Sequence, residues 1–298
     1  TCALPIFFAD GLLVHNCHQI VTDNYSTKIA ERYKYSRNFG FSATPYARSD
    51  GAHARLHSMF GPTIFEMTYQ EAVALGLTVQ IKVHWLPIRM DRDPAAGKTN
   101  DVVRKRHGIW QNEYRNSEIG KAVAELDPDS QTLVLVETVE HAVHLWRHMP
   151  TFQLCYSEMK PHDHQEYIRK GFLPPDFVNV TSEMRYNMQL AFERCELKRV
   201  IATDVWSTGV DFDNLSTVVR ADARDSEIMD TQGPGRASRV KEGKPHGNVI
   251  DTIDYFDRNW QTKSRGRFLT YESLGWEQDW PTGRRHFAQA ENTKNNRT

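Results

Sequence analysis

A short segment near residue 235 carries two arginines whose spacing suits phosphoryl chemistry. It reads Gln232-Gly233-Pro234-Gly235-Arg236-Ala237-Ser238-Arg239. A planar guanidinium group can hold two oxygens of a phosphoryl group at once. It thereby stabilises the negative charge that develops during transfer. Residues three apart lie on one face of a helix, so the sequence predicts that Arg236 and Arg239 point together into one cleft.

Three other segments carry residue types that accompany such arginines in one family of proteins. Phe41–Pro45 contains Ser-Ala-Thr, and Thr132–Glu137 is an apolar run that ends in a carboxylate. Arg199–Asp211 has an apolar run followed by Ala-Thr and later by Gly-Val-Asp. With the arginine segment, they resemble the third, fourth, fifth and last motifs of superfamily 2 helicases, in the same order. The resemblance extends over residues 17–275 and implies two RecA-like lobes, ATP and Mg²⁺ as cofactors, and nucleic acid as the partner.

The resemblance also implies roles for individual residues. Arg239 would be the arginine finger, with Arg236 and Gln232 beside the γ-phosphate, and His18 would couple the nucleotide site to Gln232. The other implied roles are cofactor binding by Gly209 and Asp211, coupling by Ser42 and Thr44, and nucleic-acid binding by Thr203 and Thr208. Most of these residues also have a structural alternative: a loop histidine, a solvated acid, a turn hydroxyl or a strand-terminating threonine.

Basic and aromatic residues alternate near the C-terminus. Lys263, Arg265 and Arg267 lie between Trp260 and Phe268, a pattern typical of surfaces that bind single strands. The alternative is that this segment packs onto the core, and the sequence leaves both interpretations open. The stretch from Asp254 to Trp276 resembles the end of phage-type DNA helicases, which is the reason to favour DNA over RNA.

The first residues resemble the C-terminal end of an intein. In that interpretation Asn16 cyclises and cleaves the chain, His15 donates a proton, and Cys17 accepts the upstream fragment. Thr1–Ile6 matches one reading frame of a common sequencing adapter, which predicts that these residues are an artefact. The alternative is that they are genuine intein sequence.

The segment Cys17-His18-Gln19 reads like the second half of a D-E-C-H box. Joining it to an upstream Asp-Glu would regenerate that helicase motif, whose acids hold Mg²⁺. The alternative is that Leu12–His18 is a degenerate box in which His-Asn replaces Asp-Glu, with the loss of most metal affinity.

Composition limits the class of protein. A length of 298 residues predicts about two domains, and no apolar run approaches the length of a membrane span. The four cysteines form no CxxC pair, which predicts a reducing cytoplasm. The net charge is −1, so nucleic-acid binding must come from local patches, for which residues 236–244 and 258–267 are candidates.

Histidine clusters predict no metal site. His141, His144 and His148 share a helix face, but no carboxylate or cysteine nearby in the sequence completes a ligand set. His162-Asp163-His164 lies in a stretch that reads as a polar loop. We therefore expect solvated surfaces at both places.

Alternating apolar and amphipathic segments predict an α/β fold with a parallel sheet, and the resemblance to helicases implies that this sheet is RecA-like. The expected strands are 132–136, 152–156, 177–181, 199–203, 217–220 and 248–253, and the expected helices are 139–148, 165–170, 185–195 and 227–239. The expected organisation is an intein end (1–16), a remnant of a first RecA-like lobe (17–88), a linker and complete second lobe (89–258), and a C-terminal extension (259–298).

No phosphate loop is expected in this chain. Gly97-Lys98-Thr99 lacks the preceding apolar strand and the earlier glycine that such a loop needs. We therefore expect this chain by itself not to hydrolyse ATP. The rival class is a non-catalytic nucleic-acid-binding module derived from a helicase.

Overall fold

The computed structural model describes residues 6–9, 12–16, 38–41, 60–206 and 212–280. The chain divides into two compact units, Thr1–Thr68 and Tyr69–Thr298. The first unit contains a small sheet of β1 (Ile6–Ala9), β2 (Leu12–Asn16) and β3 (Asn38–Phe41). β1 is antiparallel to β2, and β2 is parallel to β3.

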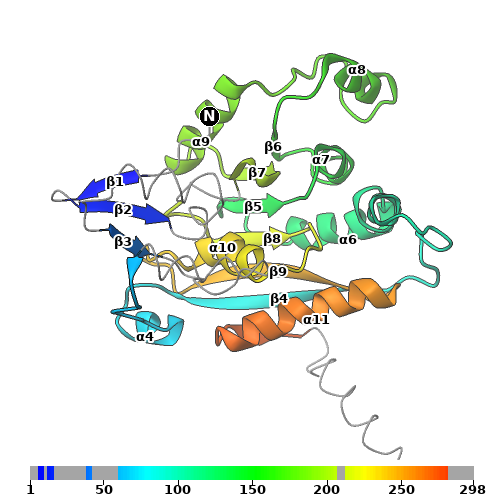
Figure 1. Cartoon of the computed structure of the whole chain (residues 1–298). Coiled ribbons are helices and arrows are strands. Elements are labelled where there is room, and N and C mark those ends of the chain that lie inside the picture. The colour runs from blue at the N-terminus through cyan, green and yellow to red at the C-terminus, as the bar shows by residue number, and fades with distance from the viewer. Residues whose placement is uncertain (1–5, 10–11, 17–37, 42–59, 207–211, 281–298) are drawn as a thin grey trace, which may run out of the picture. The chain divides into compact units, whose positions relative to one another are not determined.

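The second unit is built on a seven-stranded sheet in the order β10-β4-β9-β8-β5-β7-β6, and every neighbouring pair is parallel (Figure 1). The strands are β4 (Gln80–Ile88), β5 (Thr132–Leu135), β6 (Gln153–Cys155), β7 (Arg199–Ala202), β8 (Thr217–Arg220), β9 (His246–Asp254) and β10 (Glu277–Asp279). This topology confirms the predicted α/β class.

Helices and short turns of helix connect the strands. They are α4 (Tyr69–Ala74), α5 (Asp101–Lys105), the π-helix η1 (Arg106–Trp110), α6 (Glu113–Ala124), α7 (Val139–Trp146), α8 (Pro161–Arg169), α9 (Ser182–Glu193), the 3₁₀ turn η2 (Asp204–Trp206), α10 (Glu227–Gly235), the 3₁₀ turn η3 (Arg236–Ser238) and α11 (Arg258–Ser273). Side-chain caps start several of them: Thr138, Thr181 and Asp257 each accept a backbone N–H from the first turn that follows.

The core lies on both faces of the sheet because strand residues alternate in direction. On one face Val134, Ile201 and Val219 pack with residues of α6 and α7. On the other face Val200 and Val218 pack with residues of α9 and η3. Toward the β4 edge, a separate apolar cluster joins β4 and β9 to α11, the orange helix in Figure 1.

Several elements differ from the prediction. Residues 177–181 form no strand; Thr181 instead caps α9. α8 begins at Pro161, so His162 and Asp163 are helical rather than in a loop. β4 pairs with β9 along its whole length, so the expected boundary at 88/89 is corrected to 68/69. α11 was expected to be an extension outside the lobe, but it packs on the same sheet.

Candidate functional site at the carboxyl edge of the sheet

The carboxyl ends of β5, β7 and β8 lie side by side. Leu135 at the end of β5 is in register with Ala202 of β7 and with Arg220 of β8. The ladder continues one residue further, because Val136 N donates to the carbonyl of Ala202 at 3.0 Å. This edge is where open parallel sheets bind their ligands, and several predicted site residues lie near it.

Thr203 follows β7, and its backbone is held in place by two hydrogen bonds. Its N–H donates to the carbonyl of Cys155 at 3.1 Å, and its own carbonyl accepts from Trp206 N at 3.3 Å, which starts η2. The residue is 7% exposed. Trp206 is buried against Phe192 and Phe212 and anchors this turn. Thr208, Gly209 and Asp211 lie outside the described residues.

The two arginines of the last motif do not share a helix face, contrary to prediction. α10 ends at Gly235 because proline and glycine at the preceding positions are poor helix formers. Arg236 lies in the 3₁₀ turn, and Arg239 follows it with extended backbone. Arg236 is 9% exposed and donates to the carbonyl of Trp206, whereas Arg239 is exposed. Gln232, one turn earlier in α10, is half-buried.

A buried charge network holds the start of α10 against the strand ends. Arg220, at the end of β8, donates to Asp222 at 2.9 Å and to Asp230 of α10 at 2.8 Å. Asp230 also accepts the N–H of Ser226 at 3.1 Å. Burial by itself would raise the pKa of the Asp222 carboxyl, but the guanidinium groups of Arg220 and Arg224 lower it well below its usual range.

Arg224 extends this network to the turn that follows β7. Its guanidinium group donates two hydrogen bonds to Asp204, at 2.6 and 3.0 Å, and one to Asp222 at 2.9 Å. The residue before it, Ala223, is buried in the left-handed region with φ of 52°, a conformation that costs energy for a residue with a Cβ atom. Sequence reasoning missed this link because Asp204 and Arg224 are twenty residues apart.

Arg267 is buried, so its predicted contact with nucleic acid is corrected. It is 0% exposed and donates to both oxygens of Asp251, at 2.9 and 3.1 Å. Tyr271 donates to the same carboxylate at 2.8 Å. The physical reason is helical geometry: positions 263, 265 and 267 point in different directions once α11 forms.

Lys263 and Arg265 are both partly exposed. The Lys263 ammonium group lies 4.6 Å from the centre of the Trp260 ring. Burial, followed by the charge of Lys105, lowers its pKa. These two residues therefore remain candidates for contact with a strand, but the three basic residues do not form one surface.

The segment that follows β5 is fixed by a π-helix, which the sequence did not predict. Glu137 binds Lys105 and accepts from the indole N–H of Trp110 at 3.2 Å. Glu140 accepts from Arg106 at 2.9 Å and from Gln111 at 2.6 Å. Short π-helices are rare and occur often at functional sites. These contacts fix the position of the loop that corresponds to the fourth motif.

A carboxylate that is distant in sequence lies beside two of the histidines at the end of α7. Glu113 of α6 lies 3.1 Å from His148 Nε2 and 3.6 Å from His144 Nδ1. The same carboxylate accepts from Arg147 at 2.8 Å, so a cation would have to displace a guanidinium group. His141 of α7 is fully buried, and neither of its ring nitrogens has a hydrogen-bond partner.

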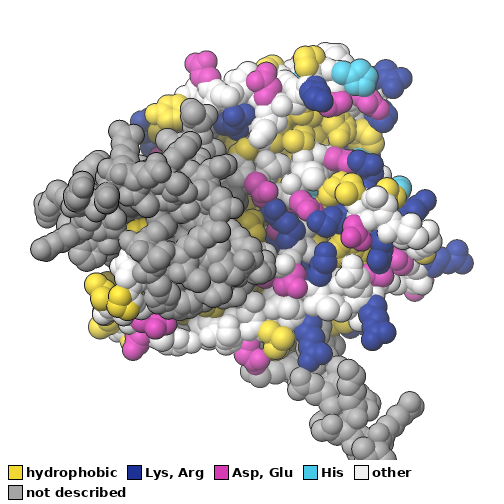
Figure 2. Space-filling model, viewed as in Figure 1, with side chains coloured by type: hydrophobic (Ala, Val, Ile, Leu, Met, Phe, Trp, Pro, Cys, Tyr) yellow, Lys and Arg dark blue, Asp and Glu magenta, His cyan; other side chains and the backbone are white. Residues whose placement is uncertain are grey.

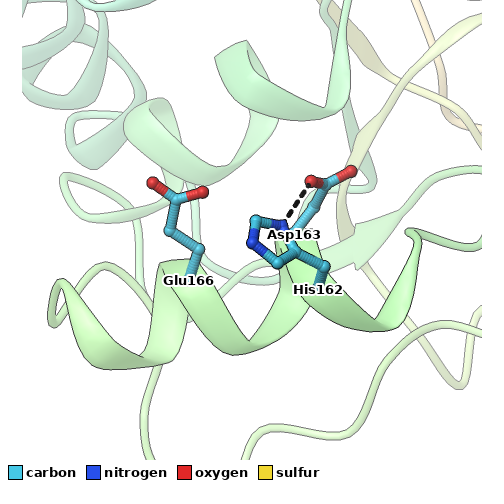
Figure 3. A group of neighbouring side chains, drawn as sticks. All are labelled: His162, Asp163 and Glu166. Carbon is cyan, nitrogen blue, oxygen red and sulfur yellow. Dashed lines mark hydrogen bonds and ion pairs between the residues drawn. The ribbon is translucent and has the colours of Figure 1, made fainter.

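His162, Asp163 and Glu166 form the group of described residues whose ligand atoms lie within 4.8 Å of one another (Figure 3). His162 and Asp163 are exposed, and Glu166 is paired with Lys170 at 2.5 Å. The group lies in the first turns of α8, where the helix dipole disfavours a cation. A solvated helix face remains the better interpretation.

Other predicted residues cannot be placed beside this site. Cys17, His18, Ser42 and Thr44 lie outside the described residues. His15 and Asn16 form the end of β2, in register with Gly40 and Phe41 of β3. The degenerate-box interpretation predicts a strand there, and this strand does not test the intein interpretation.

On the face shown in Figure 2, basic and acidic side chains are interspersed over the described surface. In the part of the chain that the structure describes, no helix is long and apolar enough to cross a membrane.

Comparison with known proteins defines the class of this fold. Residues 115–241 match the family model described as helicase conserved C-terminal domain. A fragment assigned as an HsdR subunit of a type I restriction enzyme from Vibrio vulnificus YJ016 is similar, with 22% identity and a TM-score of 0.59 over 89% of this chain and 46% of that one. S. cerevisiae Dbp5 bound to RNA and ADP BeF3 has 12% identity and a TM-score of 0.55 over 94% of this chain and 61% of that one.

The seven-stranded sheet with its flanking helices is therefore the RecA-like fold of helicase C-terminal domains. More particularly, residues 115–241 of this sheet and its helices carry the match to the helicase conserved C-terminal domain. The chain spans about half the length of the Vibrio fragment and less than two thirds of the Dbp5 chain. A search of curated proteins found no match.

Proposed function

We propose that this chain is the C-terminal part of an ATP-dependent nucleic-acid helicase or translocase, in which Arg239 acts as the arginine finger. The observation that supports the proposal is the contrast between the two arginines of the last motif. Arg236 is buried and bound to the carbonyl of Trp206, whereas Arg239 is exposed directly after η3. One arginine is thus used to hold the turn, and the other is presented to solvent on a fixed backbone.

In this proposal each residue has a defined task. Arg239 donates from its planar fork to the oxygens of the transferred phosphoryl group, where charge develops. Gln232 would contribute beside the γ-phosphate, and Arg236 keeps η2 and η3 together. ATP with its Mg²⁺ supplies the phosphoryl group. Both would be held mainly by a phosphate loop and acidic residues of a first lobe, which are not found in this chain.

The proposed partner is nucleic acid, with DNA favoured. The preference rests on the likeness of residues 254–276 to phage-type DNA helicases, while Dbp5 is described as bound to RNA. Lys263 and Arg265 are the basic residues that we propose for contact with a strand. Cytoplasmic location remains a prediction from the cysteine pattern, and a bacterial or phage source remains a prediction from the same resemblance.

The rival proposal is a non-catalytic module that binds nucleic acid without hydrolysis. The two proposals differ in what Arg239 does. A finger acts on the transition state and affects turnover, whereas an arginine of a binding module affects only the affinity for the strand.

The test is ATP turnover in a protein where this chain is joined to a first lobe with a phosphate loop. Arg239→Ala should lower nucleic-acid-stimulated kcat by about 10³-fold or more and leave ATP affinity within a few-fold. Arg239→Lys should restore little, because an ammonium group lacks the bidentate fork. Arg194, an exposed arginine at the end of α9, is the matched control. If Arg239→Ala kept near-normal turnover, the assignment of Arg239 as the arginine finger would be refuted.

We also propose that protein splicing joins Cys17 to an upstream acidic residue and regenerates a D-E-C-H box. Asn16→Ala should then block release of the upstream segment from a longer precursor. A mature protein that retains Leu12–Asn16 by mass spectrometry would favour the degenerate box instead.

A further inference from the structure

A tight turn follows the arginine finger and returns the chain toward it. Lys244 N donates to the carbonyl of Lys241 at 3.0 Å. Gly243 has φ of +78°, in the left-handed region that a glycine adopts without strain, and a Cβ atom there would meet nothing within 4 Å. The turn therefore reverses the chain between η3 and β9, and the half-buried Lys244 comes to lie near residues that precede it.

The Lys244 ammonium group joins two carbonyl groups that are far apart in sequence. It donates to the carbonyl of Leu215 at 2.6 Å and to the carbonyl of Arg239 at 3.1 Å. Leu215 is 0% exposed and lies just before β8. The carbonyl of Arg239 is thus tied to a rigid part of the core.

The backbone of Ser238, the residue before Arg239, is held by the segment that precedes β4. The carbonyl of Ser238 accepts from Thr78 Oγ1 at 2.7 Å and from Val79 N at 2.8 Å. Gly247 of β9 lies so close to η3 that a Cβ atom added at Gly247 would be 2.0 Å from the carbonyl oxygen of Ala237. The backbone of three consecutive residues, 237 to 239, is therefore fixed by contacts, while Arg239 as a whole is exposed.

We infer that Lys244 is a positioning residue for Arg239, which holds the backbone of the finger so that its guanidinium group reaches the phosphoryl group in one orientation. This inference rests on the proposed function of Arg239. Lys244 itself would touch neither nucleotide nor nucleic acid.

The partial burial of the charged Lys244 ammonium group lowers the free energy of unfolding. Burial, followed by the charge of Lys241, lowers the pKa of Lys244 to about 8. Its two hydrogen-bond partners are carbonyl groups, so neither is a carboxylate. A methionine of similar length would avoid this desolvation. A residue that served stability alone would not need the charge.

The first experiment compares Lys244→Met, Lys244→Arg and Lys121→Met, the last as a control at an exposed lysine of α6, in the same two-lobed protein. Lys244→Met should lower kcat by up to about 10²-fold, the effect of a misplaced catalytic group, with KM for ATP within a few-fold. The wild-type kcat should fall as pH rises through about 8. Lys244→Arg should keep turnover and lose that alkaline decline, because arginine stays charged. Lys121→Met should match the wild type.

The second experiment uses the chain by itself and needs no ATPase activity. Because the folded state lowers the pKa of Lys244, it releases its proton before the unfolded state does, so stability should rise as pH increases from about 8 to 10. Lys244→Met should lack this rise and be no less stable than the wild type at pH 7 in urea unfolding.

Two outcomes separate the inference from the proposed function. If Arg239→Ala abolishes turnover but Lys244→Met leaves kcat unchanged, the inference fails and the finger stands. If Arg239→Ala has no effect, both fail. A Lys244→Met variant that loses kcat only in proportion to lost folded protein, with an unchanged alkaline decline in Lys244→Arg, would assign Lys244 to stability and overturn the inference.

Discussion

Replacement of Arg267 tests whether α11 carries a strand-binding surface or a buried ion pair. In the wild type the Arg267 guanidinium group binds both oxygens of Asp251 and the carbonyl of Thr252, and both charged side chains are 0% exposed. Arg267→Met would leave the Asp251 carboxylate buried with only neutral donors, the N–H of Thr252 and the hydroxyl of Tyr271.

The expected cost follows from that uncompensated charge. Removal of one partner of a buried pair costs about 3–5 kcal/mol. Arg220 also acts on Asp251 through its charge, so we expect the lower end, about 3 kcal/mol. That corresponds to about a hundredfold shift in the unfolding equilibrium.

Urea unfolding followed by tryptophan fluorescence measures this cost, since Trp85 and Trp276 lie against Tyr271. The double variant Asp251→Asn, Arg267→Met removes both charges and should recover most of the loss. Lys121→Ala, which breaks an exposed pair with Glu118, should leave the urea midpoint close to that of the wild type, because water screens an exposed ion pair. If Arg267→Met folds with wild-type stability but binds single strands less tightly, the burial argument is refuted.

The remaining predictions concern the same lobe. Arg224→Ala should lower the free energy of unfolding by about 1.5 kcal/mol, because it releases Asp204 from a two-pronged contact; an unchanged urea midpoint would contradict this. Burial, followed by a nearby guanidinium group, lowers the pKa of His141, so the unfolded state binds the proton first and stability should fall as pH drops below about 6.5. His141→Leu should remove part of that pH dependence in thermal unfolding. Burial raises the pKa of the Cys155 thiol to about 12. A thiol reagent at pH 8 should therefore modify the partly exposed Cys195 before it modifies Cys155. Peptide mapping that finds Cys155 modified before Cys195 would count against the packing described.

Periodicity in the sequence was enough to predict five of the seven strands of the large sheet, β5 to β9. The apolar runs at β5, β7, β8 and β9 were expected within one or two residues, because a parallel strand buried on both faces has little besides apolar residues. β4 and α11 were missed because neither is a simple run of apolar residues. β4 mixes Lys82, His84 and a proline with its apolar residues, and α11 is rich in polar residues that turn out to be buried or paired.

The sequence by itself determined the fold class and the motif that contains the candidate finger, since both depend on residue types at local spacing. Only the tertiary structure decided which arginine is presented to solvent. Arg236, Arg239 and Arg267 are chemically identical, and their different exposures come from partners distant in the chain: the carbonyl of Trp206 for Arg236 and the carboxylate of Asp251 for Arg267. A charged side chain can be buried only where such a partner offsets the loss of water, and long-range packing alone brings that partner within reach.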